Sequence, residues 1–177
     1  MRIFALSDLH IDYDENARWV ANLSIAEYQN DVLILAGDVT DMRRLLDWCL
    51  STLAKRFYKV LFVPGNHDLW VVREDREMNS LQKFDDICAV VESSGASMQA
   101  FREQDVSIIP VLGWYDYSFG EPSEELKSIW MDYRAAVGRA DSRKKTLWPT
   151  LGRSTSNRSV WRVAQSLHTR TFYRASI

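Results

Sequence analysis

Residues 32–41 of this chain read VLILAGDVTD, and this stretch decides the fold. Its first five residues are apolar without alternation, which is typical of a strand buried on both faces of a parallel sheet. Gly37 and Asp38 then end the run with a turn residue and a carboxylate. Ligands of open α/β sheets bind at the loops that follow the strands, so Asp38 lies at a candidate functional site.

The same pattern occurs once before this stretch and once after it. Residues 2–10 read RIFALSDLH, and residues 60–68 read VLFVPGNHD. Each apolar run ends in a cluster of oxygen or imidazole side chains, and parallel strands bring such clusters to one edge of a sheet. Hard oxygen ligands together with neutral imidazole suit divalent cations. The sequence therefore predicts a metal site built from three strand ends.

The hydrophobic periodicity predicts an α/β fold with a mostly parallel sheet. The expected elements are strands at 2–7, 31–36, 59–64 and 106–112, and helices at about 15–28, 42–53, 81–91 and 123–134. Thr40 or Asp41 is the expected N-cap of the second helix, and Gly95 is the expected end of the third.

The charge divides the chain into two parts. Residues 1–135 hold 13 Lys and Arg against 23 Asp and Glu, whereas residues 136–177 hold nine basic residues and one acidic residue. We therefore expect one domain over residues 1–135 and an aberrant, poorly ordered basic tail over residues 136–177. A shifted reading frame is one hypothesis for the tail, because re-reading its back-translated codons restores acidic and apolar residues.

The composition also indicates which classes of protein this chain does not belong to. The net charge of −2 argues against a general nucleic-acid or membrane binder. No apolar run has the length of a signal peptide core or a membrane span. Cys49 and Cys88 fall at apolar positions of expected helices, which indicates core thiols in a reducing compartment. We expect a soluble, cytoplasmic protein.

The three clusters contain the residue types that metal-assisted hydrolysis requires. Asp8 and His10 alternate by two, so on extended backbone they point the same way. Asp38 is placed to bridge two ions, and Asn66 offers an amide oxygen without adding charge. His67 followed by Asp68 is typical of an imidazole oriented by a carboxylate.

The ordered motifs D-x-H, G-D-x-x-D and G-N-H-D, each after an apolar strand, resemble those of the calcineurin-like metallophosphoesterases over residues 1 to about 135. The resemblance implies a four-layer α/β/β/α sandwich, incomplete at its C-terminus. It also implies a hydrolase of phosphomonoesters or phosphodiesters with two divalent ions, chosen among Mn, Fe, Zn and Ni. A metal-bridging hydroxide would attack phosphorus in line.

The resemblance also assigns roles to residues. Asp8 and His10 would hold the first metal, Asp38 would bridge, and Asn66 would hold the second. His67 would be the catalytic histidine at the phosphoryl or leaving group, and Asp68 would orient it. The segment Trp114-Tyr115-Asp116 would lie near the rim of the pocket.

The sequence departs from the family after His67, where the family pattern continues with an isolated His and a G-H-x-H motif. The one later histidine here is His168, to which we assign no metal role. Three hypotheses stay open: an active phosphoesterase, a truncated and catalytically impaired fragment that binds metal weakly, and a phosphate- or nucleotide-binding regulator.

The partner of an active enzyme would be a phosphorylated small molecule or another phosphoester. A nucleic acid is the less favoured substrate, and no membrane partner is expected. Among the nearby acids, Asp12 and Asp14 are interpreted as solvated loop residues. Asp41 is interpreted as a helix cap or a group behind the metal ligands.

Overall fold

The computed structural model describes residues 1–73, 78–103, 105–113 and 120–138. Three parallel strands form the central sheet in the order β1 (Ile3–Leu6), β2 (Val32–Ala36) and β3 (Lys59–Val63). Leu6 pairs with Leu35, and Ala36 pairs with Val63, so the three strands end at the same edge. This register brings the loops that follow the strands together, as the sequence predicted.

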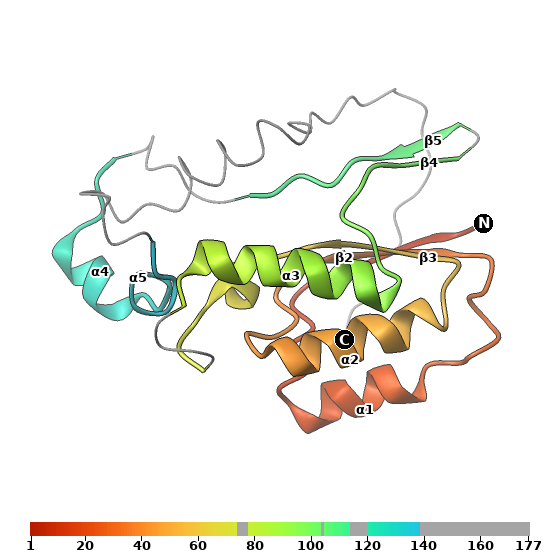
Figure 1. Ribbon diagram of the computed structural model, residues 1–177, viewed down its shortest axis with the longest axis horizontal. Helices are drawn as coiled ribbons and strands as arrows, with labels where there is room; N and C mark the ends of the chain where they lie inside the picture. Colours follow the sequence, from red (N-terminus) through yellow and green to blue (C-terminus); the bar gives the residue numbers. More distant parts are fainter. Residues whose placement is uncertain (74–77, 104, 114–119, 139–177) are drawn as a thin grey trace.

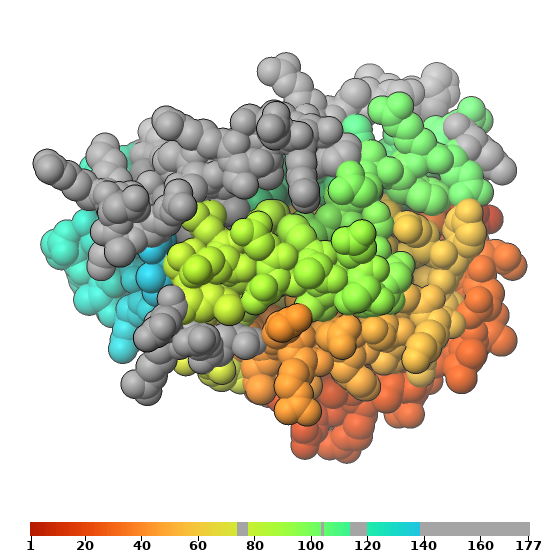
Figure 2. All heavy atoms as spheres, viewed as in Figure 1, coloured from red at the N-terminus to blue at the C-terminus, as the bar shows by residue number. Residues whose placement is uncertain are grey.

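Three helices cover one face of the sheet and lie side by side in Figure 1. They are α1 (Asp14–Asn22), α2 (Arg43–Ala54) and α3 (Ser80–Ser94). Alternate strand residues point toward them, so Leu33, Leu35 and Phe62 belong to the core together with Leu46 and Leu50 of α2. In the space-filling view the atoms of α3 lie directly against those of α2 (Figure 2).

The other strand residues face the opposite side of the sheet. Ile34, Ala36, Leu61 and Val63 line an apolar cavity of about 360 Å³ with the segment 108–113. That segment follows an antiparallel hairpin of β4 (Phe101–Glu103) and β5 (Val106–Ile108), which lies above the sheet in Figure 1. The strands are thus covered by helices on one face and by this segment on part of the other.

Helix α1 ends at Asn22, six residues before the predicted end at 28. The reason is local, because the Ser24 hydroxyl accepts the backbone N–H groups of Ala26 (3.3 Å) and Glu27 (3.2 Å). Such bonds compete with helical ones and turn the chain. The Tyr28 ring then stacks on Phe57, with ring centroids 4.9 Å apart.

Two other helix predictions need correction. The N-cap of α2 is Met42 rather than Thr40 or Asp41, although the Thr40 hydroxyl accepts the Met42 N–H at 3.1 Å. The predicted helix at 123–134 is two short helices, α4 (Glu124–Ile129) and α5 (Asp132–Ala135). Trp130 is extended between them and breaks the helical path.

The predictions for α3 and Cys49 are confirmed. Helix α3 begins with a capping box between Asn79 and Gln82, and Gly95 ends it in the left-handed conformation at φ 85°. Cys49 is a free, fully buried thiol, and burial raises its pKa to about 12. It is therefore a core residue without thiolate chemistry.

Several predictions fall on residues outside the described ranges. These are the rim segment Trp114-Tyr115-Asp116, His168 and the tail from residue 139 onward. Across the helices that the structure does describe, none has the length and apolar character needed to cross a membrane.

Candidate metal centre

Two of the strand-end loops bring three potential metal ligands to one point. Ligand atoms of Asp8 and His10, after β1, and of Asp38, after β2, all lie within 4.8 Å of one another. His10 and Asp38 are half-buried, whereas Asp8 is exposed. Two carboxylates this close repel each other unless a cation lies between them, so the arrangement fits a divalent ion.

The backbone of these ligands is strained. Asp8, His10 and Asp38 have φ values of 54°, 40° and 54°, and they are the non-glycine residues with positive φ in the described part of the chain. Side chains rarely adopt this region, and each such residue costs on the order of 1–3 kcal/mol. That cost falls on the three candidate ligands, which supports a functional role for the site.

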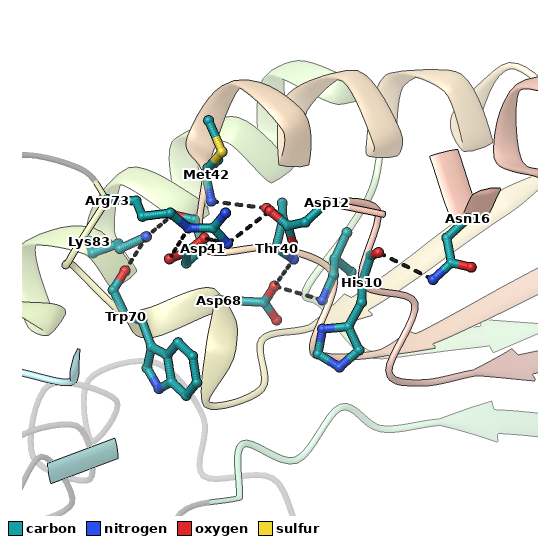
Figure 3. Close-up of polar contacts among 11 residues, drawn as sticks. His10, Asp12, Asn16, Thr40, Asp41, Met42, Asp68, Trp70, Arg73 and Lys83 are labelled. Atoms are coloured by element: carbon teal, nitrogen blue, oxygen red, sulfur yellow. Dashed lines mark hydrogen bonds and ion pairs between the residues drawn. The ribbon is translucent and has the colours of Figure 1, made fainter. Parts of the chain in front are cut away.

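Hydrogen bonds hold the strained loops together. Asp8 N donates to Gly37 O (3.1 Å), and His10 N donates to Asp38 O (3.0 Å). The side-chain amide of Asn16, on α1, donates to the carbonyls of Leu9 (2.8 Å) and His10 (3.2 Å), and Figure 3 shows it directed toward His10. The first helix therefore fixes the loop that carries two ligands.

Two glycines allow the loop after β3 to approach the loop after β2. A Cβ on Gly37 would lie 2.6 Å from the Cα of Gly65, which backbone atoms cannot accommodate. A Cβ on Gly65 would overlap the Asp38 carboxylate and lie 2.8 Å from the Asp38 nitrogen. Both positions therefore require glycine for this contact.

Asp68 is a fully buried carboxylate that joins the same two loops. Its Oδ1 accepts the N–H groups of Val39 (2.9 Å) and Thr40 (3.0 Å), and its Oδ2 accepts those of Asp38 (2.9 Å) and Gly65 (2.8 Å). Burial raises the pKa of Asp68 to about 6, against the lowering effect of the hydrogen bonds from the backbone. Both oxygens of Asp68 accept backbone N–H groups here, so the predicted role of Asp68 in orienting His67 stays a prediction.

His67 lies against the ligands through its backbone and its ring. Its N–H donates to Asp38 Oδ1 at 3.0 Å, and its imidazole meets the ring of His10 edge to face, with centroids 4.7 Å apart. The indole of Trp70 also stacks on this imidazole, with ring centroids 3.6 Å apart and 29° between the planes. The imidazole is thus held by two rings.

Sequence reasoning missed Trp70. The available signal was its spacing, because residues three apart in a 3₁₀ turn lie over one another. His67–Leu69 forms such a turn, η1, and Trp70 caps its C-terminal end.

Asn66 precedes this turn on the loop after β3. Its amide nitrogen donates to Oδ1 of Asp132 at 2.8 Å, across 66 residues of sequence. Asp132 is buried at the start of α5 and was also missed, since it falls inside the helix predicted at 123–134.

The neighbouring acids form ion pairs beside the site. Arg73 Nη2 lies 2.9 Å from Asp12 Oδ1, and Arg73 Nε donates to Asp41 Oδ2 at 2.8 Å. The Thr40 hydroxyl also donates to Asp12 (2.9 Å), and buried Lys83 donates to the carbonyls of Asp41 and Trp70 (Figure 3). Asp12 and Asp41 therefore support the loops from behind, while Asp14 is exposed in the first turn of α1.

The sequence and the fold of this chain both resemble those of known proteins. The chain is 32% identical over 125 residues to the [Acyl-carrier-protein] phosphodiesterase PptH of Mycobacterium tuberculosis, a match that covers 66% of this chain and 38% of that protein. The crystal structure of Phosphopantetheinyl Hydrolase (PptH) from the same organism matches with a TM-score of 0.67 and 25% identity, over 90% of this chain and 64% of that one.

The chain thus spans less than two thirds of the length of these relatives. The structural match confirms the predicted calcineurin-like α/β fold with its parallel sheet. The sequence model for calcineurin-like phosphoesterases matches residues 1–147, which is most of the chain. The chain therefore belongs to the calcineurin-like phosphoesterase family.

Proposed function

We propose that this chain is a metal-dependent phosphoesterase that uses two divalent ions. The observation that carries the proposal is the convergence of Asp8, His10 and Asp38, with ligand atoms within 4.8 Å, on backbone held at positive φ. Strain of this kind persists where the surrounding structure enforces it, as here through Asp68, and it clusters at functional sites.

The proposed ligands divide the work between the two ions. Asp8 and His10 would hold the first ion, Asp38 would be shared, and the amide oxygen of Asn66 would serve the second. Bound divalent ions polarise a phosphoryl oxygen and lower the pKa of a coordinated water. Mn, Fe, Zn and Ni all accept this mixture of oxygen and imidazole ligands.

His67 is the proposed proton donor to the leaving-group oxygen. Its ring stacks on Trp70 and meets the ring of His10 edge to face, so its plane is fixed before a substrate arrives. Fixed orientation of an acid group lowers the entropy cost of the reactive geometry. Asp68 supports His67 through the loop that both residues share.

The substrate that the relatives favour is a phosphodiester. PptH is a phosphodiesterase of acyl carrier protein by its name, so a phosphopantetheine diester on a carrier protein is the first substrate to test. A smaller phosphomonoester is the second. The free, buried thiol of Cys49 favours a reducing compartment, and we infer a cytoplasmic location on that basis.

The histidine count favours one alternative function. The chain has three histidines, of which His10 and His67 lie at the site, so the donor set is smaller than the family resemblance implies. A protein with these ligands alone would bind an ion and a phosphate group without rapid turnover. That alternative is a phosphate-binding regulator.

One experiment separates the two functions. The full chain is loaded with Mn²⁺, its metal content is measured by mass spectrometry, and hydrolysis of bis(p-nitrophenyl) phosphate and p-nitrophenyl phosphate is followed. We expect about two ions per chain and a loss of turnover of about 100-fold or more in Asp38→Asn.

The matched control is Asp47→Asn, which makes the same chemical change at an exposed position of α2. It should keep the metal content and the turnover of the wild type. Metal binding without turnover in the wild type would favour the regulator, and the absence of both would refute the proposed site.

A further inference from the structure

Within the described residues, the carboxylate of Asp132 accepts N–H groups from the Asn66 and Trp70 side chains and from the Trp130 side chain, which belong to two distant parts of the chain. Its Oδ1 accepts from the Asn66 amide (2.8 Å) and from the Trp70 indole (2.7 Å), and its Oδ2 accepts from the Trp130 indole (3.1 Å). The residue is 5% exposed. A buried carboxylate is costly to desolvate, so its retention at this place calls for a role.

The first contact decides which atom Asn66 offers to a cation. An ionised carboxylate only accepts hydrogen bonds, so the NH₂ group of Asn66 has to face Asp132. The amide oxygen is then the atom left for a metal. With the amide turned over, Asn66 would present N–H groups to the ion and could not bind it.

The second contact decides the plane of the His67 ring. Asp132 holds the indole N–H of Trp70, and that indole stacks on the imidazole at 3.6 Å. Because the two rings are stacked, the orientation of the indole also restricts the orientation of the imidazole. A single carboxylate thus determines the orientation of one proposed metal ligand, Asn66, and of the proposed proton donor, His67.

The position of Asp132 is itself built into the fold. Val71 N donates to Ala135 O (2.9 Å), and Ser80 N donates to Val137 O (2.8 Å). The Ser80 hydroxyl in turn accepts the Val137 N–H at 3.0 Å. These bonds attach the C-terminal end of α5 and the residues after it to Val71 and to the first residue of α3, so Asp132 does not depend on a free loop for its place.

We propose that Asp132 is a positioning residue that orients Asn66 for metal binding and, through Trp70, orients His67 for proton transfer. The inference rests on the proposed function, because it assigns Asp132 to the same site. Groups that orient metal ligands in this way typically change metal affinity about 10- to 100-fold when they are removed.

The test begins with Asp132→Asn in the full chain, a change of nearly equal shape. The new amide can donate to the Asn66 oxygen and turn the Asn66 side chain over. We expect Mn²⁺ affinity, measured by calorimetry, to fall about tenfold or more, with kcat lowered more than KM. Glu125→Gln, the same chemical change at an exposed position of α4, is the control and should match the wild type.

The exchange variant Asn66→Asp with Asp132→Asn tests the pair directly. The single change Asn66→Asp would place a second, half-buried carboxylate against the buried carboxylate of Asp132. In the double variant, the NH₂ group at position 132 takes the place of Oδ1 and donates to the carboxylate at position 66, while the amide oxygen takes the place of Oδ2 and accepts from Trp130. We expect the double variant to recover Mn²⁺ affinity relative to either single variant. A lack of recovery would overturn the proposed pairing.

Trp70→Phe tests the contact between Asp132 and Trp70, which orients His67, without altering the proposed metal ligands. Phenylalanine keeps a ring beside His67 but loses the N–H that Asp132 holds. We expect kcat to fall several-fold, while Mn²⁺ affinity stays within about twofold of the wild type.

The two proposals fail in different ways. Wild-type Mn²⁺ affinity and kcat in both Asp132→Asn and Trp70→Phe would overturn the role of Asp132 and leave the phosphoesterase intact. A wild-type chain that binds no Mn²⁺ and turns over no phosphoester would overturn the proposed function, and the role of Asp132 would fall with it.

Discussion

The carboxylate of Asp68 accepts the backbone N–H of Asp38 at 2.9 Å, although the two residues belong to different loops. It accepts three further N–H groups, from Val39, Thr40 and Gly65. Asp38 has a φ of 54°, so the proposed bridging ligand is held in a strained conformation by a buried anion behind it. The site is therefore shaped before any cation binds.

Asp68→Asn is expected to lower the free energy of unfolding by about 2–3 kcal/mol, because the new NH₂ group would face two backbone N–H donors and leave them unsatisfied. Urea denaturation of the metal-free chain measures the loss. Mn²⁺ affinity should fall as well, since Asp38 is released. A stability equal to that of Asp47→Asn, which should lie within about 0.5 kcal/mol of the wild type, would contradict the role of Asp68.

Gly65→Ala is expected to cost about 1–3 kcal/mol of stability and to lower turnover, because the added Cβ would overlap the Asp38 carboxylate. The matched control is Gly113→Ala, where a Cβ would meet nothing within 4 Å. Denaturation and turnover of the two variants give the comparison. If Gly65→Ala behaves like Gly113→Ala, the close approach of the two loops is not needed.

Asp31 should make the free energy of unfolding depend on pH in the acidic range. The Arg2 side chain donates to its carboxylate at 3.0 Å and 2.6 Å, and this hydrogen bonding holds the pKa of Asp31 below its usual range. A carboxylate whose pKa is lower in the folded chain contributes stability at every pH above its pKa in the unfolded chain, about 4. This contribution is lost as the pH falls through its pKa in the folded chain.

The variant Asp31→Asn removes that contribution. Its stability should therefore fall short of the wild type by a constant amount between about pH 5 and 8, and the gap should narrow as the pH falls below about 4. Urea denaturation across this range measures the gap. A gap that stays the same at low pH would show that the charge of Asp31 has no part in it.

The sheet and the grouping of the candidate ligands Asp8, His10 and Asp38 could be predicted from the sequence because their signals are local. Each strand is a short apolar run, and each ligand follows the run directly, as Asp38 follows residues 32–37. A parallel register then brings the ligands together without further information. The helix limits were less accurate because single side chains, such as the Ser24 hydroxyl, decided where a helix ends.

The groups behind the ligands could not be predicted because their partners are distant in sequence. Asp132 meets Asn66 across 66 residues, and no period or motif links the two. The N–H groups of Val39 and Thr40, which the Asp68 carboxylate accepts from another loop, could not be read from the local motif either, and the predicted role of Asp68 toward His67 stays a prediction. Contacts of this kind depend on how loops pack, which local sequence patterns do not encode.

Asp38→Asn should have opposite effects on stability with and without metal. In the metal-free chain Asp8 and Asp38 repel each other, because their ligand atoms lie within 4.8 Å. Removing one charge relieves that repulsion, and asparagine tolerates the positive φ of this position as well as aspartate does. The melting temperature of the metal-free variant should therefore equal or exceed that of the wild type.

Added Mn²⁺ should reverse this order. An ion that binds only the folded state stabilises the wild type by about 2.7 kcal/mol at 100 times its dissociation constant, whereas the variant lacks the shared ligand and should gain little. Thermal unfolding followed by circular dichroism, with chelator and with Mn²⁺, measures both effects. If Mn²⁺ raises the melting temperature of the variant as much as that of the wild type, the ion binds elsewhere and Asp38 is not a ligand.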